Sequence, residues 1–162
     1  MFCSLQLAGY IQRREALLGL VNKSPYETQK SRLVQDFSAF LAANSSLDGS
    51  LRTSSSIAAA SPEDICKFLY AHDGRGRTLV HCSGCEHLVS HGKHPCGCPL
   101  HLAAGTIDSF IGKLRAYFNT IGRCNPYRPG DLSTNPCASD EVKKWLKAAS
   151  VEQRRAHVTP RQ

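Results

Sequence analysis

Residues that commonly bind metal are concentrated in one short segment of the 162-residue chain. Four of its eight cysteines lie within residues 82–98, and five histidines lie within residues 81–101. The four thiols form two pairs separated by a loop, namely Cys82 with Cys85 and Cys96 with Cys98. A turn that offers two ligands at such spacing is typical of structural zinc sites, because zinc takes four tetrahedral sulfur or nitrogen ligands. Mixed thiolate and imidazole ligands favour zinc among the metals.

Spacing alone leaves the ligand set open. The four cysteines are the natural set, but His81 and Cys85 form an equally feasible HxxxC pair, and three more histidines could substitute: His87, His91 and His94. The alternative without metal is a set of reduced cysteines or a disulfide. Residues 77–100 contain few core-sized apolar side chains, so a bound metal would have to supply folding energy that packing cannot.

A catalytic zinc is not expected here. A closed site with four protein ligands is structural, whereas a catalytic zinc keeps one position for water. The zinc deaminase signature requires HxE with PCxxC. In this chain Glu86 precedes His87, and Pro95 leads into a CGC sequence, so neither half fits.

Helices must position this segment, and two of them precede it. Ser24, Pro25 and Glu27 supply an N-cap, a first-turn proline and a third-position glutamate, which predict a helix of about 20 residues. A similar start at Ser61-Pro62 predicts a short second helix that ends at residues 73–76, a DGRG sequence. The apolar residues that should face the core are Leu33, Phe37, Phe40 and Leu41 in the first helix, and Ile65, Phe68 and Leu69 in the second.

Two further helices are predicted after the cysteine segment. Apolar residues keep a 3.6-residue period over residues 107–121, and Gly122 is placed to end that helix. Ser139 can cap a last helix, in which Val142 and Trp145 share the apolar face. The stretches 44–61 and 123–138 read as loops. Together the patterns predict an all-α domain.

The charge of the chain favours a polyanionic partner. There are 20 Lys and Arg residues against 13 Asp and Glu, which gives a net charge of +7 and a pI near 9.1. Such an excess of positive charge suits nucleic acid, although many basic proteins bind none. No run approaches the roughly 18 consecutive apolar residues of a membrane-spanning helix, so we expect no membrane insertion.

Several motifs taken together resemble the ALOG domain of plant developmental regulators and, behind it, the N-terminal DNA-binding domain of retrotransposon-type tyrosine recombinases. The motifs are YETQKSR at 26–32, VHCSGC at 80–85, CGCPL at 96–100, GTID and GKLR within 105–115, and NP at 135–136. The resemblance implies a four-helix, SAM-like core-binding domain over residues 24–158 with a zinc ribbon inserted at about 77–100. Residues 1–23 would then be an N-terminal extension and 159–162 a tail.

The resemblance also implies a ligand set and an activity. Its HxxxC and CxC patterns select His81, Cys85, Cys96 and Cys98 as zinc ligands, with Cys82 as a contender. We expect no enzymatic activity, because the nucleophilic tyrosine and the Arg/His cluster of recombinases belong to a second domain.

Double-stranded DNA is the expected partner. Phosphate contacts would come from basic residues on three helices: Lys30, Arg32, Lys113, Arg115, Lys143, Lys144 and Lys147. A homo-oligomer on DNA and a nuclear location follow from this role, although no basic cluster resembles a strong nuclear signal. The alternatives are a truncated tyrosine recombinase fragment and an adaptor that uses the zinc knuckle to contact proteins.

Overall fold

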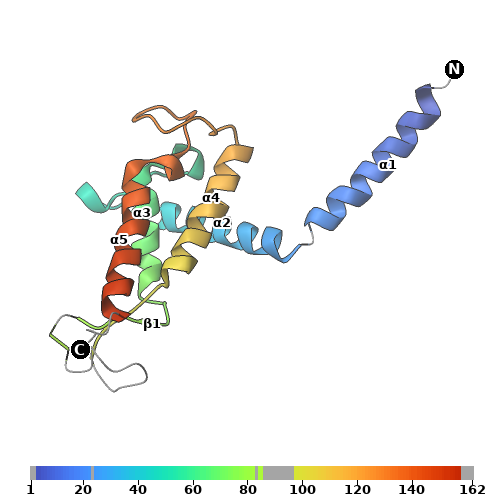
Figure 1. Ribbon diagram of the computed structural model, residues 1–162. Coiled ribbons are helices and arrows are strands. Elements are labelled where there is room, and N and C mark those ends of the chain that lie inside the picture. The colour runs from blue at the N-terminus through green and yellow to red at the C-terminus, as the bar shows by residue number, and fades with distance from the viewer. Residues whose placement is uncertain (1–2, 23, 83, 86–96, 158–162) are drawn as a thin grey trace.

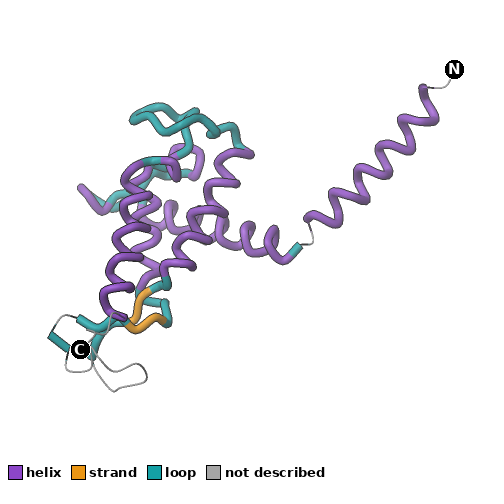
Figure 2. Tube along the Cα trace, in the orientation of Figure 1, coloured by secondary structure: helices purple, strands orange, loops and turns teal. Residues whose placement is uncertain are grey.

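The computed structural model describes residues 3–22, 24–82, 84–85 and 97–157, and they are mostly helical (Figures 1 and 2). The main elements of these described residues are five α-helices and two very short strands: α1 (Cys3–Asn22), α2 (Pro25–Asn44), α3 (Pro62–Asp73), β1 (Thr78–Leu79), β2 (Leu100–His101), α4 (Ala104–Thr120) and α5 (Asp140–His157). Three single 3-10 turns lie in the loops: η1 (Gly49–Leu51), η2 (Ile57–Ala59) and η3 (Pro136–Ala138). The predicted helical class is confirmed, whereas the SAM-like topology stays a prediction.

The hydrophobic core lies among α2, α3, α4 and α5, which pack against one another (Figure 1). Phe37, Phe68 and Phe118 are fully buried at its centre. The ring of Phe37 lies 5.0 Å from that of Phe68 and 6.5 Å from that of Phe118, both in edge-to-face geometry. Such pairs add about 0.5–1.5 kcal/mol to the effect of burial. The predicted core residues of α2 and α3 all contribute to this cluster.

The predicted helix starts of α2 and α3 are confirmed. The Ser24 hydroxyl accepts a hydrogen bond from the Glu27 amide at 3.2 Å. Ser61 and Asp64 form a reciprocal capping box at the start of α3. Each such cap stabilises a helix by about 1 kcal/mol. None of the helices in the described part of the chain has the length and apolar character needed to cross a membrane.

The helix α1 was not predicted. It leads away from the rest of the fold and meets α2 near residue 23 (Figure 1). No serine-proline start precedes it, and Gly9 and Gly19 lower its intrinsic helix propensity. It also has almost no amphipathic pattern, which is the signal that revealed α4.

A two-stranded antiparallel stem closes the base of the inserted segment. Thr78 pairs with His101 and Leu79 with Leu100. The stem is anchored to α3, because the Asp73 carboxylate pairs with His101 Nδ1 and accepts a hydrogen bond from the Leu102 amide at 3.1 Å. It is anchored to α5 as well: the Gln153 side chain donates to the Leu102 carbonyl at 2.7 Å and accepts from the Ala104 amide at 2.9 Å.

The close approach of Gly76 to the stem yields a testable prediction. A Cβ atom at Gly76 would lie 2.0 Å from the carbonyl carbon and oxygen of His101, which are backbone atoms and cannot rotate away. We expect Gly76→Ala to lower the free energy of unfolding by about 1–3 kcal/mol, the usual cost of overpacking. Urea unfolding followed by circular dichroism measures this.

The matched control is Gly112→Ala in α4, where a Cβ meets nothing within 4 Å. That variant should be neutral or gain up to about 1 kcal/mol, because alanine has the higher helix propensity. Equal stability of the two variants would contradict the steric role of Gly76.

Candidate metal centre and basic surface

Three of the predicted zinc ligands come together at the tip of the stem. The ligand atoms of His81, Cys85 and Cys98 all lie within 4.8 Å of one another. The Cys85 thiol lies 3.4 Å from His81 Nδ1. Zinc–sulfur and zinc–nitrogen bonds of about 2.0–2.3 Å place tetrahedral ligands roughly 3.3–3.8 Å apart. The distance between His81 and Cys85 falls in this range, and Cys98 lies near enough to complete a set of three ligands.

The fourth ligand stays open between two cysteines. Cys96 lies outside the described residues, as do His87, His91 and His94. Cys82 is described, and its Sγ lies 3.7 Å from that of Cys98, which suits two ligands of one metal and is too long for a disulfide. The turn that carries Cys82 and Cys85 is closed by a backbone hydrogen bond between them at 3.0 Å.

Two other cysteines have a different environment. Cys66 and Cys137 are buried in the hydrophobic core. Burial raises the pKa of both thiols to about 12, so they stay protonated at neutral pH. A protonated, buried thiol is an inert packing residue.

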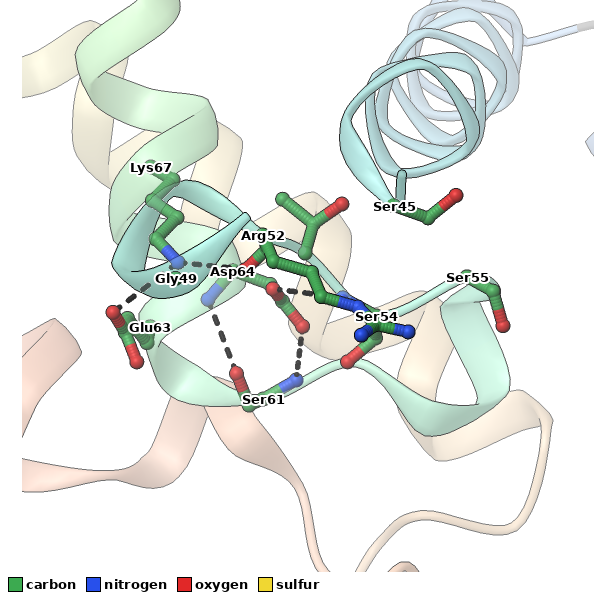
Figure 3. Close-up of a pocket in the computed structure, with 10 residues that line it drawn as sticks. Ser45, Gly49, Arg52, Ser54, Ser55, Ser61, Glu63, Asp64 and Lys67 are labelled. Carbon is green, nitrogen blue, oxygen red and sulfur yellow. Dashed lines mark hydrogen bonds and ion pairs between the residues drawn. The ribbon is translucent and has the colours of Figure 1, made fainter. Parts of the chain in front are cut away.

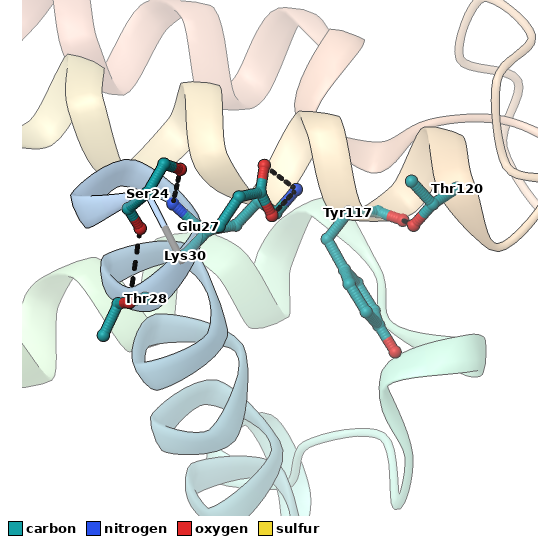
Figure 4. Close-up of polar contacts among 6 residues, drawn as sticks. All are labelled: Ser24, Glu27, Thr28, Lys30, Tyr117 and Thr120. Carbon is teal, nitrogen blue, oxygen red and sulfur yellow. Dashed lines mark hydrogen bonds and ion pairs between the residues drawn. The ribbon is translucent and has the colours of Figure 1, made fainter. Parts of the chain in front are cut away.

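Two of the predicted DNA-contacting lysines lie around one aromatic ring. Lys30 from α2 and Lys113 from α4 approach the ring of Tyr26, at 5.7 and 5.9 Å from its centroid. Lys30 also forms an ion pair with Glu27 at 2.9 Å (Figure 4), and Lys113 donates to the Ser109 hydroxyl at 2.7 Å. Both ammonium groups therefore already have intramolecular partners.

The two predicted arginines have separate positions. Arg32 is exposed on α2. Arg115 donates to the carbonyl of Cys137 at 3.2 Å, so it helps to hold the loop before α5 against α4. A structural hydrogen bond of this kind does not prevent contact with a phosphate, and the role of both arginines in DNA binding stays a prediction.

The basic residues of α5 lie beside the candidate metal site. Lys143, Lys144 and Lys147 are all exposed. Lys144 and Lys147 line an open groove of about 860 Å³ between α5 and the stem. Two metal-ligand candidates, His81 and Cys82, line the other side of the groove. Arg155 of α5 also lines it, a basic residue that the sequence analysis did not select.

A separate polar pocket at the end of α2 does not form a site (Figure 3). Three of its four charged side chains, Lys67, Glu63 and Asp64, are used within the fold, and the fourth, Arg52, is exposed. Lys67 pairs with Glu63 at 3.2 Å and donates to the carbonyl of Arg52 at 2.9 Å. Asp64 accepts from the amides of Ser54 and Ser61 at 3.2 and 2.9 Å. These contacts cap α3 and hold the preceding loop.

A buried arginine that the sequence analysis missed ties the loops to the core. Arg123 is only 4% exposed. Its guanidinium donates to the carbonyls of Thr134, Ala58 and Ala60 at 2.9, 3.3 and 2.7 Å, and lies 5.1 Å from the ring centroid of Phe118. Burial lowers the pKa of this guanidinium, but an arginine keeps its charge in proteins. No periodic pattern marks this residue in the sequence.

The described residues form a helical domain with an inserted His/Cys cluster beside a basic helix. Comparison with known families makes this specific, since the model of the ALOG domain matches residues 17–151. The chain therefore belongs to the ALOG-domain family. The match contains α2, α3, α4 and most of α5, and it excludes most of α1.

Curated relatives agree with this assignment. Protein G1-like7 from Oryza sativa subsp. japonica is 32% identical over 138 residues, which cover 85% of this chain and 58% of that protein. Protein LIGHT-DEPENDENT SHORT HYPOCOTYLS 10 from Arabidopsis thaliana is 31% identical over 144 residues, which cover 86% of this chain and 72% of that protein. The chain thus spans little more than half the length of the rice relative.

Proposed function

We propose that the chain is a non-catalytic DNA-binding domain whose contact surface combines the basic face of α5 with the metal knuckle beside it. The observation that carries the proposal is the position of Lys144, Lys147 and Arg155 along one groove with the metal-ligand candidates. These three residues belong to one helix, so they hold a fixed spacing along its axis. No ion pair is found for them among the described residues.

Electrostatics supports double-stranded DNA as the partner. A row of lysines and arginines that neutralises phosphates releases condensed counterions, which drives association. The major groove is wide enough to admit an α-helix such as α5. Lys30, Arg32, Lys113, Arg115 and Lys143 are further candidates for phosphate contacts. A phosphate contact of Lys30 would compete with its ion pair to Glu27, and one of Lys113 would compete with its hydrogen bond to Ser109.

We propose that the metal is a structural zinc ion, held by His81, Cys85, Cys98 and either Cys96 or Cys82. When bound, zinc would cross-link the two sides of the insert above the stem. The protein residues around it would then hold the insert against the groove, since Val80 and Pro99 line that groove too.

The biological role that we infer is transcriptional regulation in the nucleus. This rests on the resemblance to plant developmental regulators and on membership of the ALOG-domain family. The relation to recombinase N-terminal domains, with a SAM-like helical core, belongs to the same proposal. A homo-oligomer on DNA is compatible with a groove that lies on the surface of each copy.

A charge-reversal experiment tests the DNA surface. We expect the double variant Lys144→Glu, Lys147→Glu to bind a random-sequence duplex at least about tenfold more weakly. The slope of log affinity against log salt should fall by about two, because each lost phosphate contact removes about 0.9 from it. Fluorescence anisotropy across a salt series measures both quantities.

The control changes the net charge equally at other exposed positions, Arg52→Glu with Arg128→Glu. Both residues lie in loops and neither lines the α5 groove. The control should retain most of the affinity. If both double variants lose affinity to the same extent, the partner responds to total charge and the α5 surface is not the site.

A further inference from the structure

Two cysteines on opposite sides of the insert lie close enough to react with each other. Cys82 follows the first strand of the stem, and Cys98 precedes the second. Their Sγ atoms are 3.7 Å apart. A disulfide bond is about 2.05 Å long, so the two sulfur atoms need to approach by less than about 2 Å. The Val80 amide donates to the Pro99 carbonyl at 3.4 Å, which holds the two sides of the insert together next to this pair.

Cys82 differs from the other cysteines in its access to solvent. Cys82 is exposed, whereas Cys66 and Cys137 are buried thiols that stay protonated. Cys124 is exposed as well, but within the described part of the chain no second thiol is in contact with it. Thiol–disulfide exchange requires access to the attacking thiol and a second thiol that can displace the reagent. Cys82, with Cys98 in contact, meets both requirements.

The surroundings of Cys82 favour a negatively charged oxidant. Cys82 lines the α5 groove together with Lys144, Lys147 and Arg155, whereas Glu152 is the one carboxylate in that lining. A groove with an excess of positive charge raises the local concentration of anions and speeds their association. Oxidised glutathione is a small disulfide with several carboxylates, and it belongs to the thiol buffer of the cell. Its charge therefore complements the groove that contains the exposed thiol.

We propose that Cys82 and Cys98 form a redox-active pair that reacts with oxidised glutathione. The Cys82 thiolate attacks one sulfur of the glutathione disulfide, which forms a mixed disulfide at Cys82 and releases one glutathione thiolate. The Cys98 thiolate then attacks the Cys82 sulfur, which forms the Cys82–Cys98 disulfide and releases the second glutathione. The two cysteines lose two protons and two electrons, and two molecules of reduced glutathione gain them.

The same reaction deepens the proposed function, because it connects the oxidation of the pair to the zinc site. Cys98 belongs to the group of three ligand atoms within 4.8 Å of one another, and Cys82 does not. A sulfur atom in a disulfide is no longer a thiolate ligand. Oxidation therefore removes Cys98 from zinc, whichever cysteine is the fourth ligand. This consequence rests on the proposed zinc site, whereas the reaction of the two thiols does not.

Oxidation of the whole chain by oxidised glutathione, in zinc-free and zinc-loaded samples, tests the proposal. Remaining thiols are blocked with an alkylating reagent, and the cross-linked peptides are identified by mass spectrometry. We expect the Cys82–Cys98 disulfide as the main cross-link in both samples. In the zinc-loaded sample a chromophoric indicator should detect released zinc in equal amount to the disulfide formed, and dithiothreitol should reverse both changes.

Two serine variants separate the two steps. Cys98→Ser should stop the reaction after the first step, so glutathione should accumulate on Cys82. Cys82→Ser should form neither the mixed disulfide nor the cross-link. Cys124→Ser, at another exposed thiol, is the control and should react as the unaltered chain does. These readouts follow the covalent products, so they do not require that either variant binds zinc.

Charge reversal tests the choice of oxidant. The double variant Lys144→Glu, Lys147→Glu should react with oxidised glutathione about tenfold more slowly at low salt, because it reverses the field of the groove. Its reaction with the uncharged reagent hydroxyethyl disulfide should keep its rate. Arg52→Glu with Arg128→Glu, outside the groove, should keep both rates.

The outcomes distinguish the redox pair from the zinc site. A main cross-link between other cysteines, or a Cys98→Ser variant without glutathione on Cys82, would overturn the proposal. An unchanged rate with oxidised glutathione after charge reversal at Lys144 and Lys147 would overturn the choice of oxidant. A chain that forms the Cys82–Cys98 disulfide but binds no zinc would support the redox pair and contradict the zinc site.

Discussion

The substitution Cys85→Ser is expected to remove tight zinc binding while leaving the helices folded. The Cys85 thiol is one of three ligand atoms gathered within 4.8 Å, and a serine hydroxyl is a poor substitute for a thiolate on zinc. We expect the affinity for zinc to fall by more than about a hundredfold, beyond the usual effect of losing a supporting residue. Competition with a chromophoric chelator, at known protein concentration, measures the affinity and the stoichiometry.

Far-UV circular dichroism of the same variant should stay close to that of the unaltered protein. The fifteen residues of the buried core cluster come from outside residues 77–100, so the helices do not need the insert to bury their apolar faces. Cys124→Ser, in an exposed loop, is the control and should keep full zinc affinity. Retention of stoichiometric zinc by the Cys85→Ser variant would rule out the proposed centre.

The same measurement identifies the fourth ligand. Cys82→Ser and Cys96→Ser each remove one of the two contenders. The variant whose zinc affinity falls by the larger factor identifies the fourth ligand. The other variant should resemble the Cys124→Ser control. Comparable, large losses in both would indicate that the two thiols share the metal.

The substitution Arg123→Ala is expected to lower the free energy of unfolding more than any other substitution proposed here. Arg123 satisfies three carbonyl oxygens from two loops, and its removal leaves Thr134 and Ala60 with acceptors in a buried environment. An unsatisfied buried polar group costs about 1–3 kcal/mol, so we expect a loss of about 3 kcal/mol or more in the free energy of unfolding. Urea unfolding monitored through the fluorescence of Trp145 reports the loss.

Arg128→Ala provides the comparison, because Arg128 lies in the same loop and is exposed. Surface substitutions of this kind usually change stability by less than about 0.5 kcal/mol. If the two variants unfold at the same urea concentration, the hydrogen bonds of Arg123 contribute little and the loops are held by other contacts.

The helices of the core could be predicted because their signals are local. Ser24 and Ser61 start two helices with hydrogen bonds to residues three positions away. Gly122 ends another by adopting a positive φ of 89°, which glycine reaches without strain. Apolar residues at 3.6-residue spacing predicted which sides of α2 and α4 are buried, and Leu33, Phe37 and Leu114 are buried there.

The contacts that hold the insert and loops could not be predicted, because they join residues far apart in the sequence. Asp73 pairs with His101, 28 residues later, whereas the DGRG sequence that Asp73 begins was interpreted only as a helix end. Arg123 reaches Ala60, 63 residues earlier. Neither partnership produces a pattern within a window of neighbouring residues. The candidate metal site is intermediate: the clustered cysteines and histidines predicted that His81, Cys85 and Cys98 come together, whereas the metal and its fourth ligand stay predictions.

The short stem formed by β1 and β2 has a consequence for how the insert can vary. Its two strands, together with Asp73 and Gln153, hold both ends of the insert at a fixed separation on the helical core. The free energy of closing a loop then depends only on the logarithm of its length, and a doubling costs about 0.6 kcal/mol. Segments of different length can therefore be exchanged above the stem at a small cost in loop-closure free energy. This position is suited to grafting a new recognition loop.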